Sequence, residues 1–188
     1  MPGISIQEFV SRLRCCSAED FCDVPKIHAL LRHSPIESES IQQYLTWDSQ
    51  HYTRNLIEKT PLFELLAICW ETGQCSSIHN HMDQNCWMAV PFGKLLVQNY
   101  KVIQKNHTAG SCDIVLTNII EMNPENPAAV DPRDPVHMVY NPKEFGHRAV
   151  SLHVYSRPYD SCVVYSEEQH KCGTIKLSYT TEYGMARQ

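Results

Sequence analysis

The segment at residues 73–86 reads GQCSSIHNHMDQNC. His79 and His81 are one residue apart, and in a β-strand the side chains of residues i and i+2 point to the same face. Both imidazoles can therefore face one cavity, and two converging imidazoles are typical ligands of a transition metal. The segment predicts a metal site on a strand. It leaves open which metal binds and whether Cys86 is a ligand.

The size and composition of the chain indicate one ordinary globular domain. Its 188 residues can form a single core, with 43% of them hydrophobic and 20% charged. The formal charge is −5 without a basic stripe, which argues against nucleic acid as a partner. No apolar run has the length of a membrane span, and Gln7, Glu8 and Arg12 interrupt the N-terminus, which excludes a signal peptide. We expect a monomeric single domain over residues 1–188, with neither a nucleic acid nor a membrane partner.

The cysteines point to a reducing compartment. There are nine of them, an odd number, and no two form a C-x-x-C pair, which argues against a zinc ribbon and against thioredoxin-like chemistry. Without a signal peptide the expected location is the cytoplasm, where thiols stay reduced. Apart from Cys86, we expect most of these cysteines to be small buried hydrophobic residues.

The pattern of apolar and polar residues changes at about residue 61. Before it, residues 1–60 carry three segments with helical patterns, at 5–14, 24–34 and 40–48. After it, short apolar stretches alternate with Gly, Pro, Asn and Asp, which is typical of a β-sandwich or barrel. The proline-rich segment 123–137 is expected to be a loop. The sequence therefore predicts a helical N-terminal layer packed on a β-barrel over residues 61–188.

The histidine pair belongs to a longer pattern. The order is Gly73, five residues, His79-x-His81, four residues, Cys86, six residues and Gly93. This spacing is similar to the first motif of the cupin superfamily. In that motif a Glu usually stands where this chain has Cys86. The resemblance implies a mainly β fold, a cupin-type β-barrel or jelly roll.

The second cupin motif ends in His-x-x-x-Asn, and the sequence HMVYN supplies His137 and Asn141. His137 is therefore expected to be the third metal ligand beside His79 and His81. His147 competes for this role, but it lacks the following Asn and lies in the segment EFGHR, a predicted turn. Imidazole ligands suit Fe, Zn, Cu and Ni alike.

Three further segments resemble the cysteine dioxygenase family within the cupin superfamily. Cys86 replaces the usual Glu, SLHVYSRPYDSC stands at 151–162, and YTRNLIEKTPLFELLAICW stands at 52–70. The resemblance covers most of the chain. It implies that one ferrous iron per chain is bound by three histidines, and that Cys86 is not a ligand but forms a thioether bond with the ring of Tyr155.

The resemblance also implies the reaction and its residues. L-cysteine and O2 would give cysteine sulfinate, a step of cysteine catabolism towards taurine and sulfate. Arg54 matches the arginine that binds the substrate carboxylate, and Tyr52 matches a second group near it. His153 and Tyr155 match a hydrogen-bonded pair that positions substrate and handles a proton. Two more residues match positions near the pocket, Trp70 and Cys162.

Other functions remain open at this point. A related dioxygenase acts on 3-mercaptopropionate, but that branch commonly replaces the arginine by glutamine and the crosslinking cysteine by glycine, whereas this chain has Arg54 and Cys86. Cysteamine has no carboxylate for Arg54 to hold. A non-catalytic metal-binding cupin would have no use for the Cys86–Tyr155 pair, and three histidines do not make a closed structural zinc site.

One short segment departs from the family. Animal members commonly have Ser-Pro-Pro where this chain has Ser156, Arg157 and Pro158. A cis peptide bond before a non-proline residue costs about 3–4 kcal/mol. We therefore expect either a trans or a strained backbone before Arg157, and this leaves the orientation of the neighbouring Tyr155 open.

Overall fold

The computed structural model describes residues 3–106, 110–133 and 135–186, and its N-terminal part is helical. Helix α1, Ile6–Arg14, begins at Ser5, whose side chain accepts a hydrogen bond from the Glu8 N–H. Helix α2, Val24–His33, begins at Asp23, which caps the Lys26 N–H. Such caps satisfy backbone donors that the first helical turn leaves free. The first two predicted helices are confirmed.

The third predicted helix and the end of the helical layer need correction. Residues 40–48 were expected to be helical, but the structure has a 3-10 helix, η2, at Ser38–Tyr44; another short one, η1, spans Asp20–Cys22. The layer was also expected to reach residue 60. Instead strand β1, Thr53–Lys59, occupies its end, because residues 53–59 pair antiparallel with residues 64–69.

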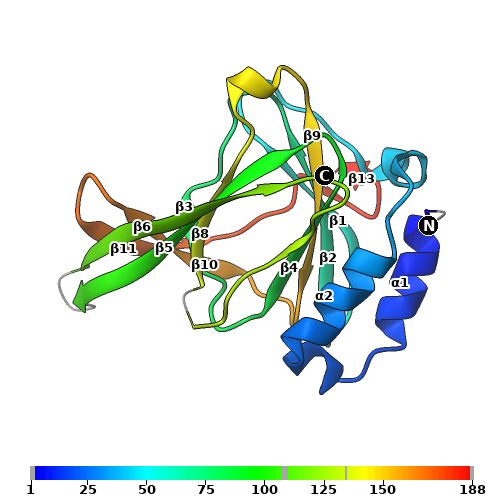
Figure 1. Ribbon diagram of the computed structural model, residues 1–188, viewed down its shortest axis with the longest axis horizontal. Coiled ribbons are helices and arrows are strands. Elements are labelled where there is room, and N and C mark those ends of the chain that lie inside the picture. The colour runs from blue at the N-terminus through cyan, green and yellow to red at the C-terminus, as the bar shows by residue number, and fades with distance from the viewer. Residues whose placement is uncertain (1–2, 107–109, 134, 187–188) are drawn as a thin grey trace.

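The strands form two sheets that face each other (Figure 1). The first sheet has seven strands in the order β13-β12-β1-β2-β9-β4-β7. Besides β1, its members are β2 (Glu64–Trp70), β4 (Cys86–Phe92), β7 (Ala128–Ala129), β9 (Ala149–Tyr155), β12 (Thr181–Glu182) and β13 (Met185–Ala186). Its central strands, β1, β2, β9 and β4, pair antiparallel with one another.

The second sheet closes on itself, in the order β10-β11-β6-β5-β8-β3. Strands β5, β6 and β11 project from the body of the protein as a long ribbon, at the left of Figure 1. The predicted loop at 123–137 contains β7 and the start of β8, so that prediction is wrong in part. The members are β3 (Ile78–His79), β5 (Leu95–Asn106), β6 (Ser111–Met122), β8 (Val136–Tyr140), β10 (Ser161–Ser166) and β11 (Lys171–Lys176), and the 3-10 helix η3 spans Lys143–Phe145.

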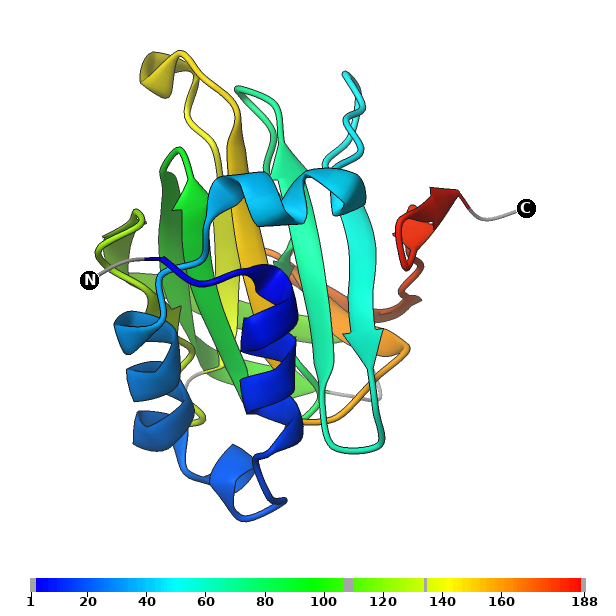
Figure 2. The same ribbon diagram turned by 90° about the vertical axis from the view of Figure 1, so that its right-hand side faces the viewer.

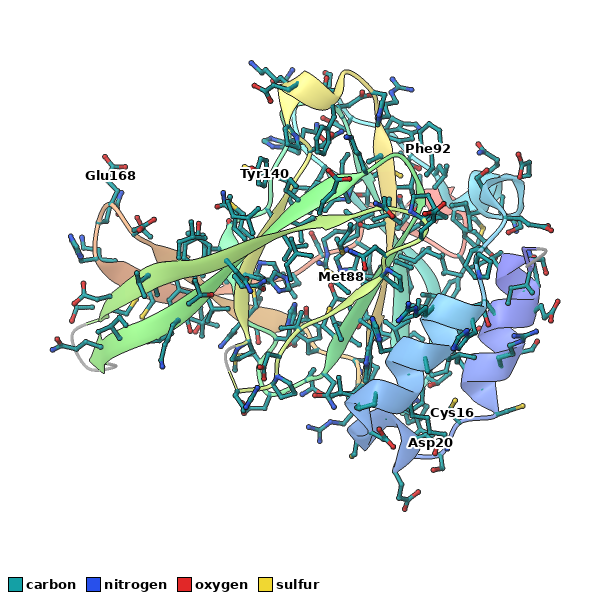
Figure 3. The ribbon with its side chains drawn as sticks, in the orientation of Figure 1. Cys16, Asp20, Met88, Phe92, Tyr140 and Glu168 are labelled. Atoms are coloured by element: carbon teal, nitrogen blue, oxygen red, sulfur yellow. The ribbon has the colours of Figure 1, made fainter. Side chains whose placement is uncertain are left out.

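The first sheet separates two cores. Helices α1 and α2 cover its outer face (Figure 2). On β2 the odd residues, such as Leu65 and Ala67, belong to the core beneath the helices, whereas the even residues, such as Leu66 and Ile68, belong to the core between the sheets. Met88, labelled in Figure 3, lies in this inner core. The mainly β, cupin-type fold is confirmed, and the inner face of the first sheet is where polar side chains could build a site.

The cysteines are less buried than expected. Only four of the nine are buried, and all nine are free thiols. The exposed and partly exposed cysteines are mostly those of the N-terminal helical layer and of loops. They are Cys15, Cys16, Cys22, Cys75 and Cys172.

Candidate metal centre

Three histidines converge between the two sheets. Strand β3 pairs with β8 so that His79 lies directly opposite His137. Ring centroids are 4.8 Å apart for His79 and His137, 4.8 Å for His81 and His137, and 5.2 Å for His79 and His81. One nitrogen of each ring lies within 4.8 Å of the others. The predicted ligand set is therefore brought together.

His81 lies in a turn and not, as was expected from the sequence, on the same strand as His79. Strand β3 ends at His79, so the two histidines do not share a strand. The chain turns immediately afterwards, with the left-handed backbone at Met82 (φ 50°) and Asp83 (φ 64°). His81 reaches the same cavity from the start of this turn. Both backbone conformations are uncommon for residues other than glycine, which indicates that the surrounding contacts hold the turn in place.

The hydrogen bonding of the three rings fits a metal. Nδ1 of His79 lies 2.8 Å from the Ser77 carbonyl oxygen, so it donates there and leaves Nε2 free. His81 and His137 are fully buried, and neither ring nitrogen of either residue has a hydrogen-bond partner among the described residues. A buried polar atom without a partner costs about 1–3 kcal/mol. A bound cation would reduce this cost by taking one nitrogen from each ring.

Burial also keeps these rings in the form that binds metals. Desolvation lowers the pKa of His79 from 6.5 to about 4. Burial, assisted by the neighbouring rings, lowers the pKa values of His81 and His137 well below 6.5. All three imidazoles are therefore neutral near pH 7, with lone pairs available for a transition metal.

A chain of hydrogen bonds runs along the inner face of β9 beside the histidines. Ser151 Oγ accepts from the Trp70 indole N–H at 2.9 Å and lies 2.8 Å from His153 Nε2. Nδ1 of His153 lies 3.3 Å from the Tyr155 hydroxyl oxygen, so Ser151, His153 and Tyr155 form one continuous hydrogen-bonded chain. The His153–Tyr155 pair was predicted from the sequence, whereas Ser151 had no predicted role.

Cys86 and Tyr155 are neighbours on adjacent strands. They are register partners of the β4–β9 ladder, and each is 1% exposed. Burial raises the pKa of the Cys86 thiol above its usual value, so the thiol is protonated at neutral pH. Cys86 is not a member of the metal cluster, which contains the three histidines alone among the described residues.

Arg54 and Tyr52 line a pocket that also contains His79. Tyr52 stacks on Trp70, with ring centroids 4.7 Å apart, and burial raises the pKa of its hydroxyl. The Nε atom of Arg54 is buried without a partner among the described residues, so this guanidinium has a donor to spare for a ligand. The residues lining the pocket here are Tyr52, Arg54, Ser77, His79, Tyr159, Cys162, Val164, Ile175 and Leu177.

The loop after β9 is held against the turn after His81. Arg157 Nε donates to Gln84 Oε1 at 2.9 Å, and two hydrogen bonds of 3.0 Å join Ser156 to Asn85. No peptide bond of the described residues is cis. The trans backbone is therefore the alternative that the structure adopts at Arg157, and the loop leaves Tyr155 facing the cavity.

The alternative third ligand lies elsewhere. His147 is exposed, and its Nδ1 lies 3.2 Å from the Arg148 carbonyl oxygen. It is not part of the cluster formed by His79, His81 and His137. The prediction that favoured His137 over His147 agrees with this geometry.

Comparison with known proteins identifies the family. A family model described as "Cysteine dioxygenase type I" matches residues 3–168. The chain belongs to the cysteine dioxygenase type I family. Family membership together with the three-histidine cluster makes this protein an enzyme, a cysteine dioxygenase, and the other functions considered from the sequence are not favoured.

Individual relatives agree with this family. Cysteine dioxygenase type 1 of Danio rerio is 22% identical over 188 residues, which cover 96% of this chain and 88% of the relative. The Rattus norvegicus enzyme is 25% identical over 169 residues, covering 89% and 82%. The Homo sapiens enzyme is 24% identical over 184 residues, covering 96% and 88%.

Solved structures with a similar chain path were also found. L-ribose isomerase of Cellulomonas parahominis aligns with a TM-score of 0.47 and 10% identity, over 84% of this chain and 86% of the isomerase. An uncharacterized Klebsiella pneumoniae protein with a double-stranded beta-helix domain aligns with a TM-score of 0.45 and 17% identity, over 63% and 87%.

Besides Ser151, two further residues near the histidines and Tyr155 had no role predicted from the sequence. Tyr159 packs against both Tyr155 and His81. Glu64 is fully buried on β2, as the register partner of Tyr155. Tyr159 follows a proline in a loop, where no periodicity predicts direction. Glu64 could have been suspected, because a charged residue at the start of an almost wholly apolar strand is rarely buried without a reason.

Proposed function

We propose that the cysteine dioxygenase activity of this protein depends on one ferrous iron per chain, held by His79, His81 and His137. The observation that carries the proposal is the set of buried ring nitrogens of His81 and His137 that have no partner among the described residues. Ferrous iron, when bound there, would supply the site at which thiolate and dioxygen meet, since three neutral ligands leave its positive charge and part of its coordination sphere available.

Arg54 is proposed to orient the substrate. Its guanidinium lines the pocket that also contains His79, and a guanidinium can bind a carboxylate through two charge-assisted hydrogen bonds. The carboxylate of L-cysteine would bind there, which directs its thiol towards the three histidines. Tyr52 lines the same pocket, and its hydroxyl would provide a second donor.

Tyr155 and His153 are proposed to control a proton beside the substrate sulfur. We propose the tautomer in which His153 Nδ1, 3.3 Å from the Tyr155 hydroxyl oxygen, donates to it, which leaves the tyrosine its own proton for another acceptor. Burial lowers the pKa of His153 to about 3, which keeps this ring neutral throughout turnover. The pair can therefore orient a proton without becoming charged.

Cys86 is proposed to form a thioether with a ring carbon of Tyr155. The new C–S bond replaces the S–H and one ring C–H bond, and dioxygen takes the two hydrogens and their electrons. The adjacent positions of both residues on β4 and β9 support this. The link would fix the phenol in one rotamer beside the histidines.

L-cysteine is favoured over related thiols. Arg54 provides a charged partner that cysteamine could not use, and Cys86 distinguishes the chain from the pattern of 3-mercaptopropionate dioxygenases. We propose a role in cysteine catabolism towards taurine and sulfate, in the cytoplasm, as a monomeric single domain of residues 1–188 without nucleic acid or membrane partners. Among the described residues, no helix combines the length and apolar character that a membrane crossing requires.

The proposal is tested by loading the protein with ferrous iron under anaerobic conditions and measuring oxygen uptake. L-cysteine, 3-mercaptopropionate and cysteamine are compared in parallel, and the product formed under 18O2 is weighed by mass spectrometry. We expect L-cysteine to be preferred and its sulfinate to carry two labelled oxygens. Preference for 3-mercaptopropionate, or equal activity with zinc in place of iron, would contradict the proposal.

A further inference from the structure

The turn that follows His81 has a conformation that its own residues do not favour. The Gln84 N–H donates to the His81 carbonyl oxygen at 3.0 Å, and the two residues between them, Met82 and Asp83, have the left-handed backbone described above. Neither is a glycine, and both side chains are exposed, so core packing does not hold them. Such conformations persist only where other contacts stabilise them. The turn therefore needs contacts from outside it.

The side chain of Gln84 supplies such contacts. Its Nε2 atom donates to the Met82 carbonyl oxygen at 3.0 Å. Its Oε1 atom accepts from Arg157 Nε at 2.9 Å and lies 3.4 Å from Ser156 Oγ. One amide thus closes the turn on one side and joins it on the other side to the loop after β9, 73 residues further along the chain.

The loop that carries Arg157 is itself anchored. The Asn85 N–H donates to Ser156 Oγ, and the Ser156 N–H donates to the Asn85 carbonyl oxygen, both at 3.0 Å. This pair continues the β4–β9 ladder by one step. The Asn85 side chain also donates to the Phe21 carbonyl oxygen at 2.9 Å. Because the start of the loop is fixed in this way, the guanidinium of Arg157 can hold Gln84 and, through it, the turn.

We propose that Gln84 and Arg157 are positioning residues of the metal centre, which hold the turn in the conformation that presents His81 to the metal. This inference rests on the proposed function, because it concerns the metal that His79, His81 and His137 would bind. Gln84 and Arg157 act through the backbone of the turn and not as ligands. When only a fraction of the molecules has the binding conformation, the apparent affinity falls by that fraction. Loss of the Gln84–Arg157 hydrogen bond should therefore weaken metal binding although all three ligands remain.

Cobalt(II) binding to the metal-free protein tests this dependence. Imidazole ligands bind this ion as well, and its visible absorption reports the bound form without any activity. The dissociation constant is measured by titration against a competing chelator. Gln84→Ala and Arg157→Ala should each weaken cobalt binding about two- to tenfold, the effect of one hydrogen bond. The double variant should bind cobalt as Gln84→Ala does, because two residues that share one hydrogen bond are coupled.

Two further variants separate positioning from general stability. Gln84→Glu keeps an oxygen that accepts from Arg157, so its cobalt affinity should match that of the wild type. In the Arg157→Ala background the same substitution should bind cobalt as weakly as Gln84→Ala. Arg14→Ala is the matched control, because Arg14 is also exposed, donates to the Glu58 side chain at 2.7 Å and lies on helix α1, at the outer face of the first sheet (Figure 2). Its cobalt affinity should be unchanged.

Circular dichroism and urea unfolding of the metal-free proteins show whether each variant is folded. Unchanged cobalt affinity in Gln84→Ala and Arg157→Ala, with or without a lower urea midpoint, would mean that the hydrogen bond at most stabilises the fold. Losses that multiply in the double variant would mean that the two residues act independently. Either result would overturn the inference. If Gln84→Ala does not fold, Arg157→Ala and Gln84→Glu decide the same question.

The experiment also distinguishes this inference from the proposed function. If the wild type binds cobalt and Arg157→Ala binds it equally well, the inference fails and the three-histidine site stands. If the wild type binds no cobalt, the site fails and the inference fails with it. If the variants bind cobalt more weakly but the iron-loaded wild type oxidises no cysteine, the proposed function fails and the role of Gln84 and Arg157 stands.

Discussion

Cys86 on β4 and Tyr155 on β9 are register partners, and both lie almost entirely out of solvent. Side chains directly opposite each other on antiparallel strands have Cβ atoms about 4.5–5.5 Å apart. The thiol and the phenol ring are therefore held beside each other by the β4–β9 ladder itself, although they are far apart in the sequence. The ladder therefore places both side chains on the same face of the sheet, as the proposed covalent bond requires.

The first prediction concerns this pair. Turnover with iron and oxygen should produce a tryptic peptide of Tyr155 joined to that of Cys86, two hydrogens lighter than their sum. Because fixing one side chain recovers about 0.5–1.5 kcal/mol, Cys86→Ala should slow oxidation several-fold to about tenfold without ending it. Peptide mass spectrometry that finds only free Cys86 after prolonged turnover would contradict the link.

Metal content should depend on the buried histidines. His81→Ala removes a ring whose two nitrogens have no other partner in the described residues, so the protein should lose stoichiometric iron and all activity while it remains folded. Metal analysis and circular dichroism measure this. His147→Ala is the control, since that histidine is exposed outside the cluster, and it should retain iron. The reverse pattern would exclude the proposed ligand set.

Arg54 should determine the preference for carboxylate substrates. Arg54→Ala removes the charged partner of the carboxylate, which we expect to cost about 2–5 kcal/mol in kcat/KM for L-cysteine. Cysteamine has no carboxylate, so its kcat/KM, which we expect to be much lower, should change little. The ratio of kcat/KM for L-cysteine to kcat/KM for cysteamine should therefore fall sharply. Equal losses for both substrates would mean that Arg54 maintains the fold of the pocket instead.

The metal-free protein should lose stability in mild acid. His79, His81, His137 and His153 have pKa values lowered by burial, to about 4 for His79 and about 3 for His153. Below pH 6.5 the unfolded chain binds protons that the folded chain excludes. Stability is thus complete above pH 6.5 and falls as the pH drops towards 4, by up to about 1.4 kcal/mol per pH unit for each such group.

Urea unfolding of the chelator-treated protein at pH 7.5 and pH 5.5 measures this loss. His153→Gln should flatten the pH dependence, because it removes one buried imidazole. His147→Ala, at an exposed position, should leave it as in the wild type. An identical unfolding midpoint at both pH values would show that these histidines are not held neutral by the fold.

Some features of this molecule can be predicted from short stretches of sequence, whereas others depend on contacts between residues far apart in the chain. The helical spacing of apolar residues predicts the first two helices, and the motif HMVYN, read as the second cupin motif, favours His137 over His147. The position of His81 depends on a turn after a two-residue strand, which strand periodicity cannot represent. Tyr159 meets Tyr155 from a loop in which Arg157 is hydrogen-bonded to Gln84, a long-range contact without a local signal.

We expect the native state to open locally at the shortest strand of the second sheet. Strand β3 joins β10 to β8 and closes the ring of strands, yet its ladder with β8 has the single register pair His79–His137. A metal bound by these two residues would add a second connection at that junction. Its removal should then accelerate amide hydrogen exchange around residues 78–81 and 137–139 while β1 and β2 keep their protection, because local opening and global unfolding are separate events. Backbone amide exchange rates would thus report whether a metal is bound by the three histidines, without any substrate present.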